Sequence, residues 1–165
     1  MEFIPCEDSL RQLQSFHPES QELVWMSPRD FLILCAGGRH HLYPELMQSA
    51  LENRDWVYKK SLDYFKEKIR KGECVFVPFL EVDIETCRVV SHEGRHRALA
   101  ALQLGVEKIP VVLYYFREGR FTDLKYETKR CPTDKLIPQW VPKKKHPRVI
   151  RNLRLLRNIV RETMR

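Results

Sequence analysis

The sequence lacks the features of a membrane-spanning or exported chain. No apolar run approaches the roughly 20 residues that a helix needs to cross a bilayer. The first residues, 1–5, do not show the basic and then apolar pattern of a signal peptide. We therefore expect a protein of the cytoplasm that does not enter membranes.

Closely spaced cysteine pairs are also lacking. The chain has five cysteines, which are far apart in sequence and odd in number: Cys6, Cys35, Cys74, Cys87 and Cys131. No Cys-x-x-Cys pair is present to hold zinc or to form a redox site. This usage is typical of a reducing cytoplasm, so we expect neither a disulfide framework nor a zinc ribbon.

Acidic residues are nearly missing from the last part of the chain. Residues 143–165 contain nine Lys or Arg and one acid, Glu162, whereas the rest of the chain contains 20 basic and 21 acidic residues. The formal net charge of +7 is therefore carried by this segment. Residues 131–147, which contain four prolines, are expected to be an extended connector ahead of it.

Residues 148–165 are predicted to form a helix with a stripe of arginines. Arginines recur there at steps of three and four residues, and apolar residues occupy much of the remaining surface. Like charges at this spacing repel one another, so the stripe favours nucleic acid or an acidic protein surface as a partner. We predict nucleic-acid contact, mainly through phosphates. The predicted contact residues are Lys143, Lys144, Lys145, Arg148, Arg151, Arg154, Arg157 and Arg161.

Hydrophobic periodicity in the middle of the chain predicts an α+β domain. A helix is expected over 56–71, with Gly72 ending it, and a short helix or turn is expected to begin with Ser27 as its N-cap and Pro28 in its first turn. Strands are expected over 23–26, 75–80, 88–91 and 109–116. The aromatic residues of the long helix are interpreted as core and flanking residues and not as a base-stacking surface: Trp56, Tyr58, Tyr64 and Phe65.

The segment 91–98 carries the most specific motif, and it has two incompatible interpretations. Residues 92–96 match the H-E-x-x-H pattern of zinc peptidases, in which both histidines lie on one face of an established helix. Here the preceding residues are typical of a strand, and Gly94 favours a tight turn over a helix interior. His92 should therefore precede the helix and His96 should lie in its first turn, which argues against a zinc peptidase.

The same residues are well suited to holding a phosphate. A helix N-terminus presents backbone N–H groups and partial positive charge. Gly94 lets the backbone approach a ligand closely, Arg95 and Arg97 add guanidinium donors, and His96 adds another. Glu93 is the candidate for a magnesium ligand or a general base. Basic residues in a first turn oppose the helix dipole, so this pattern favours a function over stability alone.

The strand, the E-G-R-H-R-A helix start and the strand over 109–116 resemble the ParB/sulfiredoxin-like family. Weaker similarity extends over residues 22–116. Against the ParB motif G-E-R-R-x-R-A, the chain keeps Glu93, Arg95, Arg97 and Ala98. Against sulfiredoxin's G-C-H-R, an arginine at position 95 replaces the reactive cysteine, which excludes sulfiredoxin chemistry.

The resemblance implies a small mixed sheet with flanking helices and a site for nucleotide phosphates. The implied nucleotide-binding residues are Gly94, Arg95, His96 and Arg97, with Glu93 and His96 as catalytic candidates and Glu93 facing Mg²⁺. The implied ligand is a nucleoside triphosphate, ATP or CTP. The domain division expected is an N-terminal extension over 1–21, a ParB/sulfiredoxin-like domain over 22–130, the connector over 131–147 and an Arg-rich helix over 148–165.

Three functions from different classes fit these observations. The first is a ParB-like nucleotide-binding domain, of the kind found on plasmids and phages, that associates with nucleic acid through its basic helix and has weak nuclease or nucleotidase activity. The second is a small-molecule kinase resembling the free-serine kinase, in which Arg29 would bind a substrate carboxylate. The third is a non-catalytic adaptor for nucleic acid or protein. The sequence leaves open whether catalysis occurs.

Overall fold

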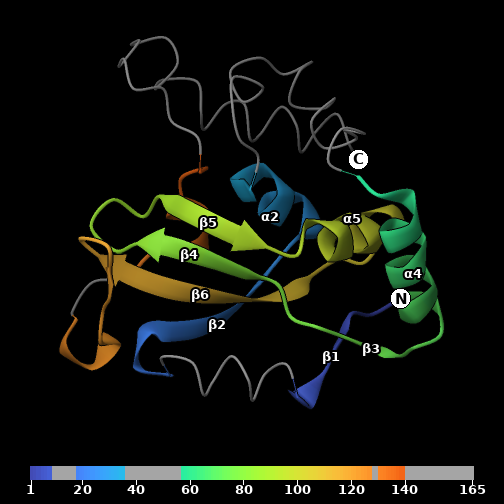
Figure 1. The fold of residues 1–165 in the computed structure, drawn as a ribbon, viewed down its shortest axis with the longest axis horizontal. Helices are drawn as coiled ribbons and strands as arrows, with labels where there is room; N and C mark the ends of the chain where they lie inside the picture. Colours follow the sequence, from blue (N-terminus) through green and yellow to red (C-terminus); the bar gives the residue numbers. More distant parts are fainter. Residues whose placement is uncertain (9–17, 36–56, 128–129, 140–165) are drawn as a thin grey trace, which may run out of the picture.

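The computed structural model describes residues 1–8, 18–35, 57–127 and 130–139, which form a mixed α+β fold (Figure 1). The helices are α2 (Pro28–Cys35), α4 (Lys59–Arg70) and α5 (Arg95–Gln103). The strands are β1 (Ile4–Pro5), β2 (Gln21–Met26), β3 (Cys74–Val75), β4 (Phe79–Asp83), β5 (Val89–Glu93), β6 (Ile109–Arg117) and β7 (Arg120–Phe121). Short 3-10 helices are η1 (Pro18–Ser20), η3 (Leu124–Tyr126) and η4 (Thr133–Lys135). Within the described ranges no helix combines the length and the apolarity needed to cross a bilayer.

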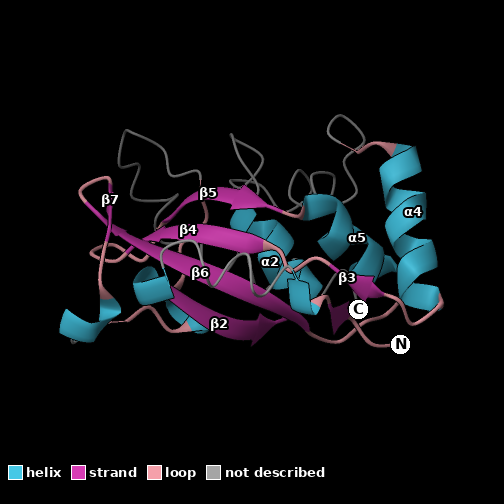
Figure 2. Cartoon of the chain, turned by 60° about the horizontal axis from the view of Figure 1, so that its bottom comes forward, coloured by secondary structure: helices cyan, strands magenta, loops and turns pink. Residues whose placement is uncertain are grey.

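A five-stranded mixed sheet organises the molecule (Figure 2). Four strands follow the order β2-β6-β4-β5, and β7 pairs with the end of β6. β6 runs antiparallel to β2 and parallel to β4, whereas β5 runs antiparallel to β4. Parallel neighbours need a crossover connection, and between β4 and β6 the chain makes it through β5 and α5. The turn that joins β5 to α5 therefore lies at the end of the sheet where β4 begins.

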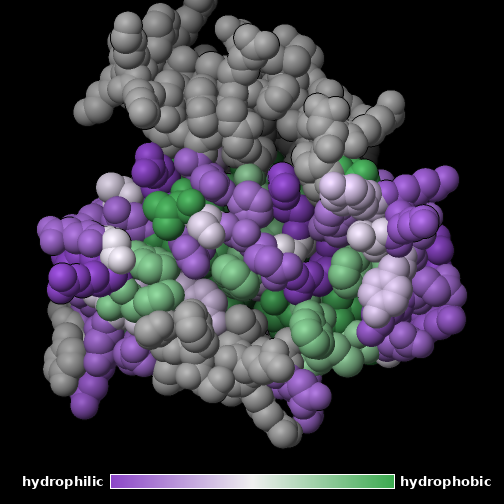
Figure 3. Space-filling model, in the orientation of Figure 1, coloured by the Kyte–Doolittle hydropathy of each residue, from purple (hydrophilic) through white to green (hydrophobic). Residues whose placement is uncertain are grey.

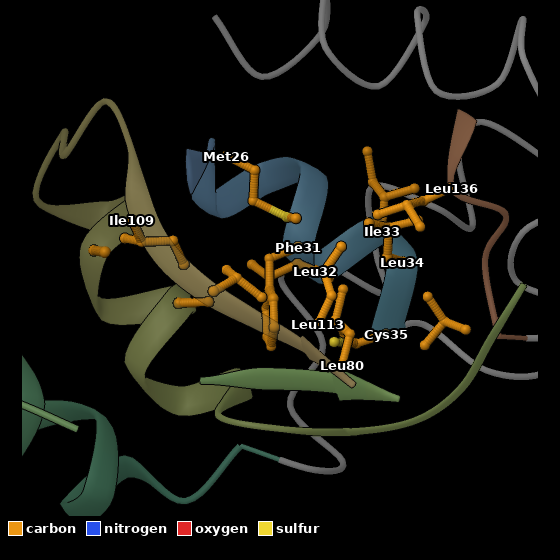
Figure 4. Close-up of a cluster of buried hydrophobic side chains, with 14 of the residues drawn as sticks. Met26, Phe31, Leu32, Ile33, Leu34, Cys35, Leu80, Ile109, Leu113 and Leu136 are labelled. Atoms are coloured by element: carbon orange, nitrogen blue, oxygen red, sulfur yellow. The ribbon is translucent and has the colours of Figure 1, made fainter. Parts of the chain in front are cut away.

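Alternation along β6 divides the core into two clusters. Ile109, Leu113 and Tyr115 belong to the larger cluster, which includes α2 and α5, whereas Val112 and Tyr114 belong to a smaller cluster on the opposite face. Strands buried on both faces read as continuous hydrophobic runs, which explains why residues 109–116 are nearly all apolar. Figure 4 shows the side chains of α2 packed against β4 and β6 in the larger cluster.

α4 is an amphipathic helix at one end of the sheet, where it packs against α5 (Figure 1). It buries Leu62 and Ile69, and Phe65 packs against the core from the same face. This spacing of three and four residues produces one apolar stripe. The helix ends ahead of Gly72, whose φ of 70° lies in the left-handed region favoured at helix C-termini. The predicted helix over 56–71 is confirmed over Lys59–Arg70, whereas residues 57 and 58 precede the helix.

The strand predicted over 75–80 is divided in two by Pro78. β3 pairs with β1 in a small parallel sheet, and β4 begins only at Phe79. Proline has no N–H for a ladder, but its carbonyl can still accept, and Val112 N donates to Pro78 O at 3.0 Å. The predicted N-cap is confirmed, because Asp30 N donates to Ser27 Oγ at 3.1 Å.

The expectation that the cysteines form no disulfides is wrong. Cys6 is bonded to Cys74 and Cys87 to Cys131, while Cys35 is a buried free cysteine. The paired residues are separated by 68 and 44 positions, so their spacing in the sequence carries no local signal. Because disulfides persist mainly in oxidising compartments, the cysteine argument for a reducing cytoplasm no longer holds.

The two disulfides attach residues 1–8 to β3 and residues 130–139 to the turn between β4 and β5. Phe3 lies in the main core, and Cys6 N donates to Val75 O at 3.0 Å, so residues 1–8 pack on β3. At the other end, residues 130–139 run beside β5, with Val89 N donating to Ile137 O at 2.9 Å. These segments, predicted to be an extension and the start of a connector, are parts of the folded domain.

Candidate functional site

A pocket of about 340 Å³ lies where α4, the β3–β4 link and the β5–α5 turn meet. The five motif residues 93–97 all line the pocket. α4 contributes Tyr64, Phe65 and Lys68, and the strand β3 with its link contributes Val75 and Phe76. The pocket therefore combines aromatic walls with basic residues and the beginning of a helix.

Gly94 makes the sharp turn on which the pocket depends. Its φ is 114°, in the left-handed region, and it is the N-cap of α5. A Cβ at this position would lie 2.4 Å from Cβ of Pro78, closer than two non-bonded carbon atoms can approach. Glycine is required here for both reasons, and the predicted strand-to-helix turn at position 94 is confirmed.

Arg97 is a buried residue that lines the pocket and connects the elements around it. Its side chain is 8% exposed, its Nη2 pairs with Oε1 of Glu93, and its Nη1 donates to Phe76 O at 2.8 Å. The guanidinium carbon also lies 5.9 Å from the centre of the Phe65 ring. These contacts join α5 to the β3–β4 link and to α4. Much of the capacity of Arg97 to bind a ligand is thus taken up inside the protein.

Glu93 lies at the end of β5 with its side chain 53% exposed. In the described part of the chain, its carboxylate pairs with Arg97. An ion pair with a neighbouring guanidinium partly neutralises a carboxylate and so weakens its pull on Mg²⁺. A catalytic or metal-binding role of Glu93 would therefore require its partner to move.

His96 connects the first turn of α5 to the start of α4. Its Nε2 accepts a hydrogen bond of 3.0 Å from the backbone N–H of Tyr58, the N-cap residue of α4. A nitrogen that accepts carries no proton, so a neutral ring has its proton on Nδ1. The centroids of the His96 and Tyr58 rings are 6.1 Å apart. His96 lines the pocket from this position.

His92 has a different hydrogen-bond partner from His96. Its Nδ1 is 2.5 Å from Oε1 of Gln139, which can only accept, so Nδ1 donates. Burial lowers the pKa of His92 from its ordinary value and the charge of Arg95 lowers it further, while the hydrogen bond with Gln139 acts in the opposite direction. The two imidazoles lie on a strand and a helix, as predicted, and not on one helical face. The described residues contain no group of three or more side chains suited to holding a metal ion.

Arg95 is the second guanidinium of the motif that lines the pocket. It is half-buried in the first residue of α5, and its charge also acts on Cys35 and His92. Burial raises the pKa of the Cys35 thiol, an effect that Arg95 opposes. The thiol is nevertheless inert at neutral pH, because burial is the larger effect.

Arg29 does not line the pocket. It lies in the first turn of α2, whereas the C-terminal end of α2, at Cys35, is the end close to Arg95. The substrate-binding role predicted for Arg29 in a kinase therefore has no support from its position. Residues 143–161, predicted to bind nucleic acid, and Trp56 lie outside the described residues.

Sequence reasoning missed the pocket residues contributed by α4 and the β3–β4 link. Tyr58 and Tyr64 were expected in the core or on its flanks, but they are 73% and 56% exposed. Only Phe65 packs on the core as predicted. The helical period contained a usable signal, because Tyr64 falls outside the stripe of Leu62, Phe65 and Ile69. No comparable signal existed for Phe76, which is 51% exposed at the pocket.

Comparisons with known proteins return no similarity for this chain: no family model matches it, and neither a curated protein nor a solved structure does.

Proposed function

We propose that the chain is a ParB-like domain that binds the phosphate groups of a nucleotide at the β5–α5 turn. The observation that carries the proposal is the pocket at the N-terminus of α5, which has Lys68 and Arg95 in its lining. The first hydrogen bond within α5 runs from Ala98 N to Gly94 O at 3.1 Å. The amides of the preceding turn lie at the positive end of the helix, where anions are stabilised.

The charges of the pocket favour an anion. Glu93 compensates the charge of Arg97. Lys68 and Arg95 add two further cations to the lining of the pocket, where phosphate oxygens would meet them. A mononucleotide also offers a base, and the pocket has Tyr64, Phe65 and Phe76 for it to contact. A volume of about 340 Å³ falls in the range of small-molecule sites.

Titration calorimetry with ATP, CTP and ADP, with and without Mg²⁺, tests the proposal. We expect binding by the wild type and a loss of about tenfold or more in Arg95→Ala, because one charge-assisted contact to phosphate is removed. Arg120→Ala is the matched control, since this exposed arginine is on β7, at the end of the sheet opposite to α4 (Figure 2). No heat with any nucleotide at millimolar concentration, or equal binding by Arg95→Ala, would contradict the proposal.

Turnover of the nucleotide or of a nucleic-acid phosphodiester is the catalytic part of the proposal. Glu93 would act as the base or the Mg²⁺ ligand, and His96 as a further catalytic group. Glu93→Gln should then abolish Mg²⁺-dependent turnover and leave nucleotide binding largely unchanged, because an amide can still accept from Arg97. Proportional loss of binding and turnover would contradict this role.

Association with nucleic acid through residues 143–165 completes the proposal. The net positive charge of the chain supports it, since that charge comes from this segment. Deletion of residues 147–165 should weaken duplex DNA binding and reduce its dependence on salt, as fewer phosphates are neutralised. An unchanged mobility shift at two salt concentrations would contradict this role of the segment.

A further inference from the structure

Large aromatic side chains gather in an exposed position around the pocket. Tyr58, Tyr64 and Phe76 are 73%, 56% and 51% exposed. Tyr64 and Phe76 line the pocket, and Tyr58 lies against the ring of His96, which lines it too. A cluster of exposed aromatic rings is unfavourable in water and marks a surface that another molecule covers.

The rings are accompanied by basic residues on one face of α4. Lys60, Tyr64 and Lys68 follow one another at intervals of four, which places them along the same side of the helix. The ammonium group of Lys68 lies 5.4 Å from the centre of the Tyr64 ring. Tyr64 is held in turn by Phe65, whose ring is edge-on to it at 5.2 Å. The face is therefore both cationic and fixed in place.

The segment that contains this face carries a net positive charge. Residues 57–73 include six Lys or Arg and three acids. One of these acids, Glu67, pairs with Arg70 and Lys71 at 3.9 and 3.4 Å, near the C-terminal end of the helix. Figure 3 shows hydrophilic residues dominating the end of the molecule where α4 lies, with paler and more hydrophobic residues among them.

We infer that this face of α4, with Tyr58 and Phe76, binds single-stranded nucleic acid whose bases stack on the aromatic rings. Stacking on aromatic rings combined with a basic path for the backbone is the usual way in which proteins hold single strands. Duplex DNA keeps its bases inside, so it cannot use the rings. An acidic peptide would use the lysines and not the rings. The inference rests on the proposed function, since one phosphate of the strand would enter the pocket.

Comparison of two strands with equal charge tests the inference on the full chain. The probes are a fluorescent oligothymidylate and an abasic deoxyribose-phosphate strand of the same length. Both present the same phosphates to residues 143–165, so any preference for the strand with bases reports stacking. We expect the wild type to bind oligothymidylate about tenfold more tightly than the abasic strand, the typical effect of one stacked base.

Variants show which side chain produces the preference for the strand with bases. Tyr64→Ala should lose it, and Tyr64→Phe, which keeps a ring, should retain it. Trp25→Ala is the matched control, because Trp25 is 51% exposed on β2 and does not line the pocket. Equal affinity of the wild type for the two strands overturns the inference, as does a preference that survives in Tyr64→Ala.

The two proposals fail in different ways in these measurements. Mononucleotide binding that is sensitive to Arg95→Ala, without a preference for bases in the strand, leaves the proposed function standing and overturns the stacking surface. A preference that depends on Tyr64, without mononucleotide binding, overturns the phosphate pocket and supports the stacking surface.

Discussion

The guanidinium of Arg97 donates a 2.8 Å hydrogen bond to the backbone carbonyl of Phe76 and so fixes the β3–β4 link against the first turn of α5. The same side chain pairs with Glu93. Arg97, which the sequence predicts to bind phosphate, thus also holds two walls of the pocket together. Its two neighbours in the motif, Arg95 and His96, line the pocket from the same turn.

Arg97→Ala should reduce the free energy of unfolding by about 2 kcal/mol, because it leaves the Phe76 carbonyl and the Glu93 carboxylate without their donor. Arg95→Ala, by contrast, should reduce stability less than Arg97→Ala does, because Arg95 is half-buried and Arg97 is buried, and it should reduce nucleotide binding. Urea denaturation of both variants checks the difference. Equal stability of Arg97→Ala and wild type would show that the contacts of Arg97 with Phe76 and Glu93 do not stabilise the fold.

Gly94→Ala should be more destabilising than alanine at another glycine with positive φ. Left-handed backbone at a non-glycine residue carries a penalty of about 1 kcal/mol, and at position 94 the new Cβ would also meet Pro78 at 2.4 Å. Gly105→Ala is the control, since its φ is 73° and nothing lies within 4 Å of the added Cβ. Thermal melting should give a clearly larger loss for Gly94→Ala. Matching losses would mean that the close approach to Pro78 is relieved without strain.

Much of the local structure around the site could be predicted from particular residues. The β-branched run before position 91 and Gly94 predicted a strand followed by a turn, and the structure has β5 ending at Glu93 and α5 beginning at Arg95. Three apolar positions in helical register predicted α4. These signals are local, since they follow from backbone preferences and from which face of an element is buried.

The walls of the pocket could not be predicted in the same way, because they come from distant parts of the chain. Phe76 reaches Arg97 across 21 residues, and Tyr58 reaches His96 across 38. Such contacts depend on how α4 packs against α5, which the sequence pattern does not specify. The disulfide between Cys6 and Cys74 is a further case, since it depends on the pairing of β1 with β3.

Oxidation state should affect stability through both disulfides. Cys87–Cys131 closes a loop of 44 residues and Cys6–Cys74 one of 68, and restriction of the unfolded chain by loops of this size stabilises a fold by about 4 kcal/mol each. Melting should therefore occur at a lower temperature with a phosphine reductant present. Alkylation of the unfolded, unreduced chain followed by mass spectrometry should label Cys35 alone. Labelling of all five cysteines in material kept under air would contradict the pairing.

Acid should destabilise the fold through His92. Burial lowers the pKa of this imidazole below the ordinary value of 6.5, so in the pH range beneath that value the unfolded chain binds a proton that the folded chain does not. Stability from this group is therefore complete above pH 6.5 and declines as the pH falls toward the lowered pKa of the folded state. His92→Gln cannot titrate and should show a smaller loss of unfolding free energy between about pH 7 and about pH 5 in urea titrations. An equal loss in the variant and the wild type would mean that other groups account for the acid sensitivity, and it would contradict a buried neutral imidazole bonded to Gln139.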